Sequence, residues 1–155
     1  ADGHTLVGGQ GSIIQEQITV FPTPFINTSD SYLQTGMEVA ITPKLASSKI
    51  VVTSIFNINY NATNIPYGMA ARLYNLNTSA QIGLGQNSDG FFFSNGPWVI
   101  GDGYVQFAVR AVDDQTNSTS LRTYGLAIST FDSNSDISLN STWGTNTITA
   151  TEIAQ

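Results

Sequence analysis

The sequence has no cysteine and a single histidine, His4. Without cysteine, the chain has neither a disulfide bond nor a thiolate metal site. One histidine excludes metal sites built on two, and any Ser-His-Asp triad would have to use His4. That residue lies in a glycine-containing terminal stretch, which does not hold a catalytic group rigidly. These absences exclude several common classes of enzyme.

Charge is also scarce. Charged residues make up 10% of the 155 residues, against roughly 25% in an ordinary soluble domain. The net charge is −6, and the scattered basic residues form no positive stripe for a phosphate backbone, so we predict no nucleic-acid binding. Threonine, serine and asparagine take the polar positions. Such a neutral surface suits packing in an assembly, because each buried charge would have to be desolvated or paired.

Long apolar runs are missing as well. No run approaches the roughly 20 residues of a membrane-spanning helix, so we predict no membrane insertion. The first residues, Ala1 to His4, contain no basic segment followed by an apolar one. We therefore expect no signal peptide.

Alternation of apolar and polar residues dominates the rest of the chain, and no amphipathic helix of three turns is evident. Lys49–Tyr60 is apolar on both sides near its start, which predicts a central strand. The pattern predicts an all-β fold, a single β-sandwich or jelly-roll domain over residues 12–155 behind an extended, glycine-rich N-terminal arm at residues 1–11. We expect strands at Ser12–Phe21, Leu33–Ile41, Lys49–Tyr60, Gly68–Leu76, Gln81–Leu84, Tyr104–Val112, Leu121–Thr130 and Asn146–Ile153. We expect connections at 85–103, with a short strand at 90–94, and at 132–140.

Carboxylates are the remaining candidates for catalysis, as a pair serving glycoside hydrolysis. The candidates are Glu16, Glu38, Asp113 and Asp114, and nothing in their spacing brings them together. The alternating oxygens of residues 132–136 resemble a Ca²⁺ loop, but Ile137 stands where that loop needs glycine. We predict no enzymatic activity, no cofactor and no metal site.

An aromatic segment is the strongest candidate for a binding site. Phe91, Phe92 and Phe93 with Trp98 stand among glycine, asparagine and proline. A strand would place Phe91 and Phe93 on one face and Phe92 on the other. One interpretation is a core strand; the other is a subunit contact or receptor platform, extended by Tyr67, where aromatic rings anchor a partner or stack on a sugar.

Two stretches carry a resemblance to a known family. Residues 35–52, TGMEVAITPKLASSKIVV, resemble a "TG…ITP…SSKI" hairpin in a virion structural module of tailed bacteriophages. Residues 148–153, ITATEI, are similar to the threonine-rich closing strand of related chains, and Ser12–Gln15 to their opening strand. Such modules occur in tail fibres, head fibres and capsid-decorating proteins, usually as trimers.

The resemblance implies a virion surface protein, made in the host cytoplasm. Only a short arm precedes the module, which favours a homotrimeric capsid decoration (cement) protein on the phage head, bound to the major capsid protein or other virion proteins. We expect the arm, with His4, Leu6 and Val7, to anchor it to the shell. The alternative is the receptor-binding tip of a tail fibre that recognises a host-surface glycan or protein.

Overall fold

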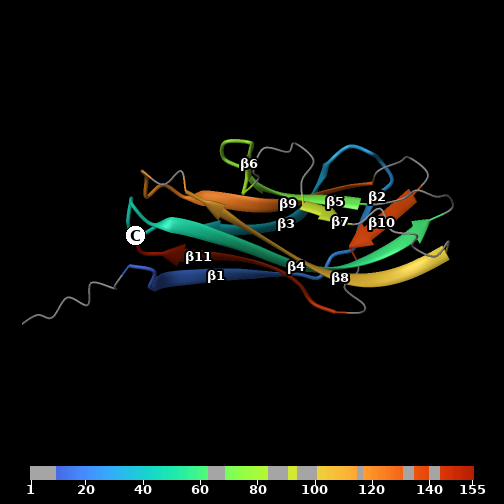
Figure 1. Ribbon diagram of the computed structural model, residues 1–155, viewed down its shortest axis with the longest axis horizontal. Coiled ribbons are helices and arrows are strands. Elements are labelled where there is room, and N and C mark those ends of the chain that lie inside the picture. The colour runs from blue at the N-terminus through green and yellow to red at the C-terminus, as the bar shows by residue number, and fades with distance from the viewer. Residues whose placement is uncertain are drawn as a thin grey trace, which may run out of the picture.

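A computed structural model describes residues 10–62, 69–83, 91–93, 101–114, 117–130, 135–139 and 144–155. In these residues two antiparallel sheets form two layers, and their strands run along the long axis of the molecule (Figure 1). Sheet A contains β1 (Ile13–Phe21), β2 (Phe25–Asn27), β4 (Lys49–Ala62), β8 (Gly101–Asp113), β10 (Ser135–Leu139) and β11 (Asn146–Ile153). Sheet B contains β3 (Leu33–Ile41), β5 (Met69–Asn75), β6 (Ala80–Ile82), β7 (Phe91–Phe93) and β9 (Arg122–Thr130). The all-β sandwich predicted from the sequence is confirmed.

Strand β4 organises sheet A, as its two-sided apolar pattern predicted. It pairs with β8 along its whole length on one side. On the other side it pairs first with β11, from Lys49 to Ile55, and then with β10, from Ile58 to Ala62. Between these partners, the side chain of Asn146 accepts a hydrogen bond from the Asn57 backbone N–H at 2.8 Å, which satisfies a donor that neither strand reaches.

Alternation along the strands determines the core between the sheets. Ile50, Val52 and Phe56 of β4 point inward, and Phe56 packs on the Phe107 ring at 5.9 Å between centroids. From sheet B, Tyr124, Leu126 and Ile128 of β9 fill the same space. Strand β3 of sheet B packs against β1 and β11 of sheet A, so the core between the sheets extends to these strands as well.

The expected hairpin over residues 35–52 is not formed, because β3 lies in sheet B and β4 in sheet A and the two strands do not pair. Three expectations about boundaries were also wrong. The stretch 132–140 is not a loop throughout, because residues 135–139 form β10, with Ile137 and Leu139 buried; its serine and aspartate content concealed a period of two. Strand β8 starts at Gly101, inside the expected connection 85–103. Strand β2 was not expected after Pro22 and Pro24; it is short and ends its sheet, where proline nearby is tolerated.

The chain before β1 is tied to the end of β11. Gly11, the last residue of the expected arm, donates its N–H to the Ala154 carbonyl at 2.9 Å, and Ala154 donates to Ser12 at 2.9 Å. The arm residues His4, Leu6 and Val7 lie outside the described residues.

Strand β3 has a bulge at Gly36, and Thr35 and Gly36, the first two residues of the TG motif, explain it. The pairing of β3 with β9 shifts between Gln34 and Glu38, and Gly36 adopts a φ of 77°. The Thr35 hydroxyl donates a hydrogen bond to the Leu126 carbonyl at 2.8 Å, and it accepts one from the Met37 backbone N–H at 3.1 Å. The threonine thus replaces ladder bonds that the bulge removes, while glycine supplies the left-handed backbone.

Two glycines predict graded costs for added methyl groups. We expect Gly36→Ala to destabilise the fold by about 1 kcal/mol, through backbone strain alone, because nothing lies nearer than 3.8 Å to the added carbon. Gly83→Ala should cost more, since its φ is also 77° and the new carbon would lie 2.3 Å from Cβ of Ala111. Urea unfolding midpoints measure both, with exposed Glu38→Ala as the control. Equal losses at the two glycines would contradict this account.

Candidate functional site

The structure places the aromatic segment in sheet B. Residues 91–93 form β7, the short strand predicted there, paired antiparallel with β5. In this register Phe91 lies opposite Ala71, Phe92 opposite Ala70 and Phe93 opposite Met69. Trp98 and Tyr67 lie outside the described residues. The receptor-platform interpretation therefore stays a prediction.

The candidate carboxylates are not brought together. Glu16 is exposed on β1 of sheet A, and Glu38 is exposed on β3 of sheet B, so the core of the sandwich separates them. Asp113 is buried at the end of β8, whereas its neighbour Asp114 is exposed. Among the described residues no group of three metal-ligating side chains converges. In the same residues no helix is long and apolar enough to cross a membrane.

Glu152 is the first of two buried charged groups, and it joins the two motifs of the family resemblance. It lies in β11 and has no exposed surface. Its Oε1 accepts the backbone N–H of Lys44 and Leu45, both at 2.9 Å, and the Ser48 hydroxyl at 2.7 Å. Its Oε2 accepts the Gln15 amide at 2.6 Å. One carboxylate thus ties the TPKLASS loop and the opening strand to the TEI ending.

The surroundings of Glu152 favour its charged form. Burial by itself would raise the pKa of this carboxyl. The hydrogen bonds from Lys44, Leu45, Ser48 and Gln15 outweigh burial and lower the pKa below its ordinary value of 4.5. All the donors are residues of the chain itself, so the Glu152 cluster stabilises the fold. We call Glu152 and its four donors the Glu152 lock.

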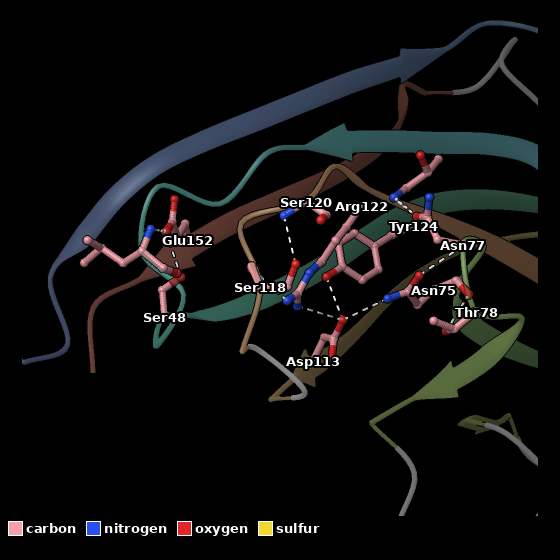
Figure 2. Close-up of polar contacts among 12 residues, drawn as sticks. Ser48, Asn75, Asn77, Thr78, Asp113, Ser118, Ser120, Arg122, Tyr124 and Glu152 are labelled. Carbon is pink, nitrogen blue, oxygen red and sulfur yellow. Dashed lines mark hydrogen bonds and ion pairs between the residues drawn. The ribbon is translucent and has the colours of Figure 1, made fainter.

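Asp113 is the centre of the second buried group, which links the sheets (Figure 2). Its Oδ2 accepts hydrogen bonds from the Tyr124 hydroxyl at 2.8 Å and the Asn75 amide at 3.2 Å, and pairs with Arg122 Nη1 at 3.4 Å. Arg122 also donates to the Ser118 carbonyl at 3.2 Å. Burial raises the pKa of the Tyr124 hydroxyl, and the hydrogen bond to Asp113 raises it further. The group holds the end of β8 in sheet A against β5 and β9 in sheet B.

Sequence reasoning missed both groups, although a signal was present. Asp113 continues the inward parity of Val109 and Ala111, and Glu152 continues that of Ile148 and Ala150. A charged residue on the same face of a strand as buried neighbours must have partners inside the protein, since an unpaired buried charge is prohibitively costly. Parity therefore identifies such residues, but it does not identify their partners.

The outer face of sheet A is a regular surface, and we define it by three rows across β1, β11, β4 and β8. Directly opposed residues of antiparallel strands share a face. The rows are Val20-Thr147-Ile55-Ala108, Ile18-Thr149-Thr53-Arg110 and Glu16-Thr151-Val51-Val112.

Apolar side chains on this face meet the solvent. Ile18 is 61% exposed, Val20 56%, Val112 42% and Ile55 38%. The threonines of β11 fill the space between them, and Glu16 and Arg110 are the charged members of the rows. A contiguous apolar and neutral surface on a strand layer is typical of a protein–protein contact.

The strands, core and surface together define an antiparallel, two-sheet β-sandwich protein. No protein-family model matches the sequence, and no curated protein matches it. Among solved structures, the chain is similar to the VP2 subviral particle of infectious bursal disease virus, with 13% identity, a TM-score of 0.40 and 93% of this chain covered. A structure of the Gt strain of that virus has 17% identity, a TM-score of 0.34 and 93% coverage, and one of the Gx strain has 14%, 0.32 and 92%. The chain spans 39%, 38% and 37% of those chains, respectively.

Proposed function

We propose that this protein is a structural component of a virus particle, a homotrimeric decoration (cement) protein on the head of a tailed bacteriophage. The observation that carries the proposal is the outer face of sheet A. It exposes Ile18, Val20 and Val112 on a regular, nearly neutral layer. Covering such a face releases water from apolar surface and desolvates few charges, which favours assembly.

The buried polar groups support a structural role. Glu152 and Asp113 hold strands and loops together with donors of the chain itself. Their side chains are closed off from solvent, at 0% and 3% exposed. The strongest charge interactions described thus serve the stability of the sandwich.

The family resemblance supports a place on the virion of a tailed phage. Two of its separate parts are joined in the structure, because Lys44, Leu45 and Ser48 of the TPKLASS loop donate hydrogen bonds to Glu152 of the TEI ending. Residues far apart in sequence that depend on each other in this way behave as a module. In tailed phages, modules that this sequence pattern resembles belong to surface proteins of the virion.

Locating the protein in an intact particle tests the proposal directly. We expect cryo-EM density for a trimer on the head surface, at threefold positions. Density at the tail apex alone would overturn head decoration in favour of the receptor-binding tip. A glycan-binding assay on the purified protein complements the imaging, and decoration predicts no specific binding there.

Removing residues 1–9 tests the arm. This deletion spares the Gly11–Ala154 hydrogen bond that closes the start of β1, so we expect unchanged thermal unfolding. Losing the apolar contacts of Leu6 and Val7 should weaken attachment to undecorated particles at least about tenfold. Co-sedimentation with particles measures this, and full occupancy after the deletion would show that the arm does not anchor the protein.

A further inference from the structure

We infer that the outer face of sheet A is a contact between copies of this chain, in which Glu16 of one copy pairs with Arg110 of the next. The inference deepens the proposed homotrimer by naming the surface that joins its subunits. It takes only the number of copies from that proposal.

The placement of the two charges is the first argument. Glu16 lies on β1 and Arg110 on β8, at opposite sides of the four-strand face. Three strand spacings separate them, about 14 Å, so they do not pair within one copy. Among the described residues Arg110 has no carboxylate partner. A face with opposite charges at its two sides is complementary to itself.

The second argument is that the charges are presented on this face. Val112 and Ile18 stand two residues from Arg110 and Glu16, so all four side chains share one side of the sheet. The Thr151 hydroxyl donates to Glu16 Oε2 at 3.0 Å, which holds the carboxylate over the face. The exposed apolar groups lie beside and between the charges, as in an interface with a polar rim.

The third argument concerns the whole molecule. Copies of a chain with a net charge of −6 repel each other in most relative orientations, because these orientations bring negative charges close together. The three rows carry one acid and one base, so they add no net charge to a contact between copies. A copy of this chain therefore fits the face better than a strongly charged partner does.

Cyclic closure follows from the same geometry. When three sheets turn their outer faces toward a threefold axis, the β1 side of each copy meets the β8 side of the next. Every copy then forms the Glu16–Arg110 contact on both sides. The central strands β11 and β4 lie nearest the axis, and Ile18 and Val20 lie at the junction with the next copy. No polar network has to be rebuilt, since Glu152 and Asp113 face the core.

Charge reversal with rescue tests the inference on the full-length chain. Analytical ultracentrifugation measures the association of the wild type, Glu16→Arg, Arg110→Glu and the double variant. Each single reversal places like charges together, so we expect association to weaken at least about tenfold, with recovery of most of the loss in the double variant. Glu38→Arg, on the outer side of sheet B, is the control and should associate like the wild type.

Each outcome decides the inference. A specific contact between copies should produce association at a concentration on the order of 10⁻⁴ M. A wild type that stays monomeric at about 100 µM would therefore overturn the inference. Single reversals that leave the assembly intact, or a double variant that fails to recover, would also overturn it. A dimer that depends on both charges would support the contact and contradict the trimer. This assay uses no virus particle, so its failure would not contradict head decoration. Cryo-EM of the intact particle tests head decoration separately.

Discussion

Replacing Glu152 by glutamine is expected to lower the free energy of unfolding by about 3 kcal/mol or more. The carboxylate is fully buried, and the N–H groups of Lys44 and Leu45 with the Ser48 hydroxyl converge on one of its oxygens. An amide removes the charge and one acceptor, so buried donors lose their partner or face another donor. In a chain of this length that loss lowers the melting temperature by roughly 6–12 °C. Differential scanning calorimetry measures it.

Glu38→Gln is the matched control for this variant. Glu38 is exposed on β3 and has no hydrogen bond of this kind among those described, so the change should be within about 0.5 kcal/mol. Equal stability of Glu152→Gln and the control would show that the lock contributes nothing.

The dependence on pH gives the lock a second signature. The folded pKa of Glu152 lies below its ordinary value of 4.5. Between these two values the unfolded chain binds more protons than the folded one, so stability rises with pH there. The contribution is complete above the ordinary value and is lost as the pH falls through the folded pKa. We expect the gap in unfolding free energy between wild type and Glu152→Gln to shrink in acid; a constant gap would contradict the assignment.

Replacing Asp113 by alanine should cost about 3–4 kcal/mol. It leaves the guanidinium of Arg122, a residue that is 6% exposed, without the Asp113 carboxylate, and the hydroxyl of the fully buried Tyr124 without its acceptor. An uncompensated buried charge is the costly part, so removing both partners should be milder. We expect Asp113→Ala/Arg122→Met to recover at least about 1 kcal/mol relative to Asp113→Ala.

The neighbouring residue supplies the control for Asp113. Asp114 is exposed, and Asp114→Ala should change stability by about 0.5 kcal/mol or less. Denaturant unfolding of the wild type, Asp113→Ala, Arg122→Met and the double variant completes a double-mutant cycle. Strict additivity of the Asp113 and Arg122 losses would mean that the pair has no coupling and that its role is packing alone.

Much of the fold was predictable because strand alternation is a local property. Lys49–Tyr60 was identified as central from apolar residues on both sides, and β8 from Val105, Phe107, Val109 and Ala111. The prediction failed where composition obscured the pattern: serine and aspartate around Ile137 indicated a loop, and two prolines concealed β2. Neither error altered the fold class.

The candidate site was much less predictable. The sequence drew attention to Phe91–Phe93 and Trp98, whereas the exposed face that carries the proposed function lies on β1, β11, β4 and β8. These strands are far apart along the chain, and each contributes few exposed apolar residues to the face: Ile18 and Val20 from β1, Ile55 from β4, Val112 from β8 and none from β11. Register between distant strands creates the face, and register follows from the shared core and not from local pattern.

The sequence by itself determined the class of this protein: alternation, absent cysteine and scarce charge dictate a β-sandwich with few charged residues, because side-chain parity and composition act residue by residue. Only the tertiary structure decided which residues meet. Glu152 reaches the loop at Lys44, and Glu16 comes to lie across the face from Arg110, through strand pairing over long separations. Such pairings minimise the energy of the whole core at once, so no single stretch of the chain contains them.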